Sequence, residues 1–173
     1  MNKQILNSVL LFVLAVLLQV LIFKRINLSF GEFDYCHFII YPIIIISLPF
    51  KTPRPLVILI GFLAGLCIDM FYNSPGVHAS AAVFIAFLRP MILKLLEPYE
   101  GYKIDLSPTL KNMGFNWYLP YVSSMLFIYM IFYFSVEAFS FVYYFEILMR
   151  TIFSFIASII VLLIYEIISS ARS

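Results

Sequence analysis

Five side chains of metal-binding types stand out in this sequence, and their spacing matches no familiar metal site. They are Cys36, His37, Cys67, Asp69 and His78. Adjacent residues such as Cys36 and His37 point in different directions on a helix, so they do not converge on one ion. Both cysteines lie in apolar stretches, where a buried thiol is usually a small hydrophobic group. We therefore expect neither a metal site nor a disulfide framework.

Ionisable residues inside the apolar segments are also sparse. Asp69, Arg89 and Glu166 lie far apart along the chain, whereas a proton or ion path needs several such groups in succession. The sequence also lacks a nucleophile elbow, a zinc-protease helix, a phosphate-binding loop and a C-x-x-C pair. We expect no catalytic residue, no cofactor, and no channel or pump activity.

The composition indicates an integral membrane protein. Of the 173 residues, 64% are hydrophobic and 12% are charged, and the mean hydropathy is +1.03. Soluble domains carry about 45–50% apolar and about 25% charged residues. A soluble fold of this size could not hide so much apolar surface. The net charge of +2 is too small to indicate a nucleic-acid partner.

Six apolar segments approach the length of about 20 residues that a membrane-spanning helix needs. They are 5–23, 33–50, 56–72, 77–96, 118–136 and 145–169. The first is longer than the apolar core of a signal peptide and is followed by Lys24 and Arg25, so we expect it to remain as a helix. The second contains Pro42 and ends at Pro49, which neighbouring helices can accommodate. We predict an all-α protein, with residues 1–173 forming one compact transmembrane domain of six helices.

The placement of lysine and arginine predicts the orientation. With the N-terminus inside, the loops and ends on the inner side carry seven of these residues and the outer side carries two. The seven are Lys3, Lys51, Arg54, Lys94, Lys103, Lys111 and Arg172; the two are Lys24 and Arg25. Aromatic residues near the segment ends are expected to anchor at the membrane–water interfaces. They are Tyr35, Tyr41, Tyr72, Tyr99, Tyr102, Trp117, Tyr118 and Tyr121.

The third and fourth segments form a helical hairpin with small residues along one face of each helix. Residues three or four apart lie on the same side of a helix. This places Gly61, Gly65 and Asp69 on one stripe, and Ala79, Ala82, Ala86 and Arg89 on another. Small residues allow close helix packing in a membrane, either within the chain or with a partner. We keep both interpretations, internal packing and a docking groove for a partner helix.

The charges of this hairpin are predicted to act separately. Arg89 lies about ten residues deeper than the level of Asp69, or roughly 15 Å, which is too far for an ion pair. We expect Asp69 to lie near His78 and to accept hydrogen bonds from backbone donors. Arg89 is expected to extend to the inner interface or to meet Glu166.

Two further local features follow from spacing. Ser74 is predicted to cap the fourth segment, with Pro75 at its first helical position. Glu146 and Arg150, four residues apart, are predicted to form an ion pair on one helix face.

The hairpin resembles the rod shape-determining MreD family. The matching residues are Gly61-x-x-x-Gly65-Leu66-x-x-Asp69, followed by Pro75-Gly76-x-His78-Ala79. The segments Gly114-Phe115-Asn116-Trp117-Tyr118 and Glu137-Ala138-Phe139-Ser140-Phe141, with Leu148-x-Arg150 and Ser154, resemble the Bacteroidetes-type form of the family. Many relatives have Pro-Leu-Gly at the turn where this chain has Ser74-Pro75-Gly76. The family motif covers Gly61, Gly65, Asp69 and Gly76, without assigning their role.

The resemblance implies a non-enzymatic scaffold of the elongasome in the bacterial inner membrane, which supports rod cell shape. Its partners would be an MreC-like single-span protein and, indirectly, the MreB filament, a RodA-type glycosyltransferase and the elongation transpeptidase that build the lateral-wall peptidoglycan. The fold would resemble the six-helix substrate-binding subunits of energy-coupling-factor transporters, although fold similarity does not transfer function.

The alternative is a subunit that binds a small, vitamin-like molecule for transport. Such subunits commonly use an A-x-x-x-A motif in the first helix to contact their coupling protein. Here Ala15 is flanked at those positions by Leu11 and Gln19, which disfavours that function.

Overall fold

The computed structural model describes residues 3–25, 28–30, 33–103, 106–139 and 144–172. Side chains are described for 10–24, 37–103, 106–139 and 144–170. The long helices are α1 (Lys3–Leu21), α3 (Arg54–Tyr72), α4 (Val77–Leu95), α6 (Phe115–Ala138) and α7 (Tyr144–Arg172). The short elements are η1 (Phe23–Arg25), β1 (Leu28–Phe30), β2 (Phe33–Cys36), α2 (Ile43–Ile46) and α5 (Leu110–Met113). Strands β1 and β2 pair antiparallel.

Among the described residues, helices α3, α4, α6 and α7 are each long and apolar enough to cross a membrane. Helix α1 begins and ends within two residues of the predicted segment 5–23. Helices α3, α4, α6 and α7 likewise coincide with predicted segments, extended by a few residues at some ends. The prediction of an apolar helical protein is therefore confirmed for these elements.

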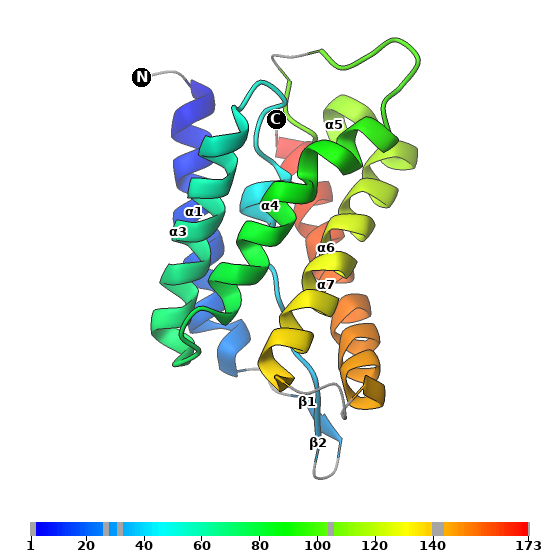
Figure 1. Cartoon of the computed structure of the whole chain (residues 1–173). Coiled ribbons are helices and arrows are strands. Elements are labelled where there is room, and N and C mark those ends of the chain that lie inside the picture. Colours follow the sequence, from blue (N-terminus) through cyan, green and yellow to red (C-terminus); the bar gives the residue numbers. More distant parts are fainter. Residues whose placement is uncertain (1–2, 26–27, 31–32, 104–105, 140–143, 173) are drawn as a thin grey trace.

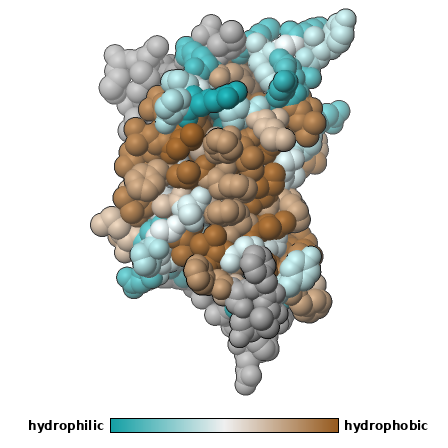
Figure 2. Space-filling model, in the orientation of Figure 1, coloured by the Kyte–Doolittle hydropathy of each residue, from teal (hydrophilic) through white to brown (hydrophobic). Residues whose placement is uncertain are grey.

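The long helices pack as neighbours in the order α1, α3, α4, α6 and α7. Figure 1 shows that α1 begins and α7 ends at the same end of the bundle, where α4 is joined to α5. An apolar band crosses the middle of the visible face, and hydrophilic residues gather above it (Figure 2). Exposed side chains in the described helices are largely aliphatic, such as Leu17, Leu63 and Ile160. This surface suits contact with lipid.

The predicted helix over residues 33–50 is wrong. The chain there forms β2 and continues without helix over residues 37–40, and we call residues 33–40 the extended segment. Only Ile43–Ile46 forms a helical turn. Pro42 disfavours helical geometry in Tyr41 and ends the extended stretch, while Pro49 follows the short helix α2.

Side chains of the flanking helices satisfy the extended backbone. The amides of His37 and Ile39 donate to Ser154 Oγ and Ser158 Oγ on α7, both at 2.9 Å. Two extended residues advance about 6.6 Å, and four helical residues advance about 6 Å, so amides two residues apart can pair with serines four residues apart on the helix. This provides partners for backbone groups that would otherwise be unpaired in hydrocarbon.

Gln19 of α1 forms hydrogen bonds with the backbone of the extended segment on the side opposite α7. Its Oε1 accepts from the Ile40 amide at 2.8 Å, and its Nε2 donates to the Phe38 carbonyl at 2.8 Å. Ala15, one turn earlier on α1, is buried with Gln19. The extended segment is thus held between α1 and α7 by polar side chains that stand out in apolar helices.

An aromatic cluster secures the connection between α4 and α6. Phe50 stacks on Tyr102 with ring centroids 4.4 Å apart, and Trp117 Nε1 donates to the Leu96 carbonyl at 2.7 Å. The Tyr102 hydroxyl donates to the Leu93 carbonyl at 2.7 Å. Burial raises the pKa of Tyr102 to about 12, so its hydroxyl remains a donor at physiological pH.

The predicted interfacial aromatic belt is only partly correct. Tyr99 is fully exposed, as an anchoring residue should be. By contrast, the side chains of Tyr41, Tyr118 and Tyr121 are fully buried in the bundle. They lie near segment ends in sequence but face other elements: Tyr41 contacts His78 and Tyr129, Tyr118 lies beside Glu166 of α7, and Tyr121 contacts Arg89 and Ile46. The side chain of Tyr35 lies outside the described residues.

Candidate functional site

The two small-residue stripes of α3 and α4 face each other inside the chain. A Cβ added to Gly65 would lie 2.4 Å from Ala79 Cα and 2.7 Å from the His78 carbonyl oxygen. A Cβ added to Gly61 would lie 3.1 Å from the Ala82 carbonyl oxygen and 3.3 Å from Ala86 Cβ. The glycines therefore permit the backbones of α3 and α4 to approach closely. This contact agrees with the interpretation that the stripes pack within the chain. It leaves no open surface for a partner helix at Gly61 or Gly65.

Asp69 closes this hairpin from the end of α3. Its Oδ1 accepts from the His78 amide at 3.0 Å, and its Oδ2 accepts from the Gly76 amide at 3.1 Å and the Ala79 amide at 2.9 Å. Ser74 Oγ donates to Oδ1 at 3.0 Å. These amides lie at the N-terminus of α4, where backbone donors lack helical partners and the helix dipole favours negative charge.

The expectation that Asp69 accepts backbone hydrogen bonds next to His78 is confirmed. The predicted cap at Ser74 is wrong, because α4 starts at Val77 and its N-cap is Gly76, in the left-handed conformation at φ +86°. Asp69 supplies the capping carboxylate from the preceding helix. Ser74 instead donates to that carboxylate and so contributes to the turn.

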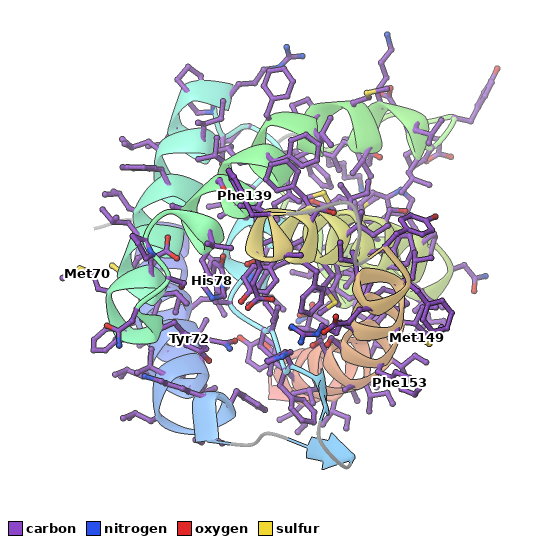
Figure 3. All side chains as sticks on the ribbon, turned by 60° about the horizontal axis from the view of Figure 1, so that its bottom comes forward. Met70, Tyr72, His78, Phe139, Met149 and Phe153 are labelled. Atoms are coloured by element: carbon purple, nitrogen blue, oxygen red, sulfur yellow. The ribbon has the colours of Figure 1, made fainter. Side chains whose placement is uncertain are left out.

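A buried hydrogen-bond network extends from His78 into the bundle. His78 Nδ1 lies 3.0 Å from the Tyr129 hydroxyl, which lies 2.7 Å from the Tyr41 hydroxyl. The Tyr41 hydroxyl donates to the His78 carbonyl at 3.1 Å. The Tyr72 ring packs edge-on to the His78 ring, with centroids 5.1 Å apart, and both residues are labelled in Figure 3. The network joins α4 and α6 to Tyr41, which follows the extended stretch, and Asp69 and Tyr72 connect it to α3.

Sequence reasoning missed most of this network. Tyr41 and Tyr72 were expected at an interface, and Tyr129 lies in an apolar helix without a distinctive spacing. The available signal was Gln19, a polar residue in the first apolar segment, since its amide must find partners. It contacts both the extended segment and the Tyr72 hydroxyl, the latter at 3.0 Å.

Arg89 is buried deep in the bundle and does not extend to the interface. Its side chain is 3% exposed, and Nε donates to the Tyr121 hydroxyl at 3.1 Å. Its Nη2 donates to the Leu48 carbonyl, and Tyr121 donates in turn to the Ile46 carbonyl at 3.1 Å. Arg89 thus binds the carbonyl of Leu48, two residues beyond the end of α2, and orients Tyr121 toward the carbonyl of Ile46, much as basic side chains bond carbonyls at helix C-termini.

Both expectations for Arg89 are therefore corrected. The guanidinium does not reach lipid headgroups, because α2 and α6 cover it. Its expected partner Glu166 instead accepts a hydrogen bond from the Leu110 amide at 3.0 Å. Arg89 also has no ion pair with Asp69 among the described residues, in agreement with the depth argument.

Replacing Arg89 by methionine is expected to destabilise the bundle by about 1–3 kcal/mol. The Leu48 carbonyl and the Tyr121 hydroxyl would lose a buried donor, while removal of a buried charge offsets part of that cost. Unfolding of the purified protein by SDS titration in mixed micelles would measure the loss. Lys94→Met is the matched control, because Lys94 is exposed near the end of the same helix. Equal stability of the two variants would contradict the buried role of Arg89.

The structure thus brings the predicted residues into two groups on one hairpin. One group forms the α3–α4 contact with its capping carboxylate, and Arg89 contacts α2 and α6 further along α4. The members of the first group are Gly61, Gly65, Asp69, Ala79, Ala82 and Ala86, all buried. Gly76 is exposed at the turn, where its positive φ is the feature that requires glycine.

The predicted pair Glu146–Arg150 is confirmed, with Arg150 Nη2 at 2.6 Å from Glu146 Oε1. The described residues contain no group of three histidine, cysteine or acidic side chains placed to hold a metal ion. Cys36, one of the residues considered for such a site, has its side chain outside the described part. The α3–α4 hairpin is thus characterised by close helix packing and by hydrogen bonds to Asp69.

No known protein family, curated protein or solved structure matches this chain.

Proposed function

We propose that this protein is a non-enzymatic membrane scaffold of the MreD type, acting in the inner membrane with the elongasome. The observation that carries the proposal is the hairpin itself. The residues that resemble the family motif, from Gly61 to Ala79, act as one unit. Asp69 caps α4, and Gly65 allows the backbone of α4 to pack closely against α3. A rigid hairpin of this kind presents its outer faces in a fixed geometry.

The proposed partner is an MreC-like single-span protein, and its helix would contact a lipid-facing surface of the bundle. Through that protein the scaffold would associate with the MreB filament, the RodA-type glycosyltransferase and the elongation transpeptidase. In a membrane, apolar exposure alone does not favour a partner over lipid, since helix association depends on packing and hydrogen bonds. The experiment must therefore sample each exposed face.

Burial of Ala15 and Gln19 favours a scaffold over the vitamin-transporter alternative. Those positions are where a transporter subunit would present its A-x-x-x-A motif. In this chain Gln19 instead bonds the extended segment of its own fold.

Photocrosslinking in living cells would test the scaffold proposal. A photoreactive amino acid would replace exposed residues of each long helix, one at a time: Leu17, Phe62, Met70, Phe87, Phe127, Ile156 and Ile164. Adducts with the single-span partner are expected from one of these faces. The control position is Leu126, a buried and larger side chain of α6, which is expected to give adducts only within the chain. If no exposed position captured a wall-synthesis protein, the scaffold proposal would fail.

A further inference from the structure

A small charged cavity lies between the end of α6 and the start of α7. Its volume is about 220 Å³, and it is lined by Phe134, Glu137, Ala138, Glu146, Ile147 and Arg150. Figure 3 views this end of the bundle, with Phe139 following α6 and Met149 on α7. The volume is below the roughly 300–1,000 Å³ of pockets for drug-sized ligands, so the cavity suits a small group.

The charges of the cavity are unevenly matched. Arg150 Nη2 lies 2.6 Å from Glu146 Oε1, whereas its Nη1 lies 3.7 Å from Glu137 Oε2. The remaining contact of Glu137 is a 3.3 Å hydrogen bond from the Tyr133 hydroxyl to Oε1. One arginine thus faces two carboxylates, and Glu137 keeps the weaker contacts. A cation with hydrogen-bond donors would complete this side of the cavity.

Arg150, which lines the cavity, also has an unused donor. Arg150 Nε is buried and has no hydrogen-bond partner among the described residues. Most buried polar atoms in native proteins have a hydrogen-bond partner, with ordered water included. An anionic oxygen would suit a guanidinium donor. The cavity therefore presents an acceptor for a cation and a donor for an anion within one small volume.

We propose that this cavity binds the headgroup of a phosphatidylethanolamine lipid. The primary ammonium would donate to Glu137, and a phosphate oxygen would accept from the Arg150 guanidinium. Phe134, Ala138 and Ile147 form an apolar wall, and the cavity lies where two apolar helices reach the membrane boundary. Headgroups of lipids occupy that depth. A choline headgroup has no N–H donor for Glu137, and a glycerol headgroup has no cation.

Native mass spectrometry of the protein from micelles would test the proposal. The micelles would contain equal amounts of phosphatidylethanolamine, phosphatidylcholine and phosphatidylglycerol. The wild type is expected to retain phosphatidylethanolamine in preference to the other two. Glu137→Gln is expected to retain it about tenfold less, because the acceptor of the ammonium loses its negative charge. Glu97→Gln, in the connection at the opposite end of the bundle, is the matched control and is expected to behave as the wild type.

A second variant separates lipid binding from folding. Ala138→Leu would fill the cavity without altering a charge, and it is expected to lower phosphatidylethanolamine retention while the protein still unfolds cooperatively. Equal retention of the three lipids by the wild type would overturn the proposal. Undiminished retention of phosphatidylethanolamine by both Glu137→Gln and Ala138→Leu would overturn it as well. The test is independent of the scaffold function, because it needs no partner protein.

Discussion

Gly65→Ala is expected to destabilise the protein by about 3 kcal/mol, whereas Gly61→Ala, one turn away, should change stability by less than about 1 kcal/mol. The added methyl at Gly65 would lie 2.4 Å from Ala79 Cα and 2.7 Å from Ala79 N. These are backbone atoms of α4, so the whole helix would have to move. That movement would also disturb the hydrogen bonds between Asp69 and the α4 amides.

The matched substitution at Gly61 meets more accommodating neighbours. Its methyl would lie 3.1 Å from the Ala82 carbonyl oxygen and 3.2 Å from Ile45 Cδ1, so shifts of a few tenths of an ångström would suffice. Alanine also gains about 0.5–1 kcal/mol over glycine inside a helix, which offsets part of the crowding. SDS titration of both variants in the same micelles would measure the difference. Equal losses would contradict the close approach at Gly65.

The same pair of variants separates folding from partner binding. The geometry places Gly65 in an intramolecular contact, so Gly65→Ala should lose stability before it loses any partner. A Gly65→Ala protein with wild-type stability but without partner adducts would instead identify this stripe as a docking surface.

The hairpin could be predicted from the sequence because its geometry is local. A short turn joins the two helices, so Asp69 must lie level with the first residues of α4, and His78 becomes its neighbour. Likewise, four-residue spacing fixes which small residues share a face. These inferences needed only helix geometry and loop length. The cap was misassigned because Ser74 and Asp69 can both accept from α4 amides, and the sequence does not rank them.

The extended segment could not be predicted in the same way. A run of about 18 apolar residues reads as a spanning helix, because extended backbone in a membrane normally lacks hydrogen-bond partners. Its partners here are Gln19, Ser154 and Ser158, which come from helices distant in sequence. The sequence showed that these side chains are polar, but it did not show that all three bond to the backbone of the same segment. The burial of Arg89 has the same origin, since one of its acceptors, Leu48, belongs to this misassigned segment.

Asp69→Asn is expected to be the most damaging single-atom change in the described part of the chain, with a loss of about 3–6 kcal/mol. The carboxylate accepts two hydrogen bonds at each oxygen, and an asparagine amide keeps only one acceptor oxygen. In the place of Oδ2 its NH₂ group would face the Gly76 and Ala79 amides, and in the place of Oδ1 it would face the His78 amide, while the Ser74 hydroxyl could turn to accept from it. Each unpaired buried donor costs about 1–3 kcal/mol, and loss of the charge at the α4 N-terminus adds to this.

A loss of this size is comparable to the whole stability of many domains, about 5–15 kcal/mol, so the variant should accumulate poorly in cells. Ser74→Ala is the matched control, because it removes one of the four hydrogen bonds and leaves every α4 amide with its acceptor. It should cost no more than about 1 kcal/mol. The amount of folded protein in membranes and the SDS midpoint in micelles would rank the two variants. If Asp69→Asn folded as well as Ser74→Ala, the carboxylate would not be the cap of α4. The motif residue would then have to act at a partner's surface, which its 3% exposure in this fold does not permit.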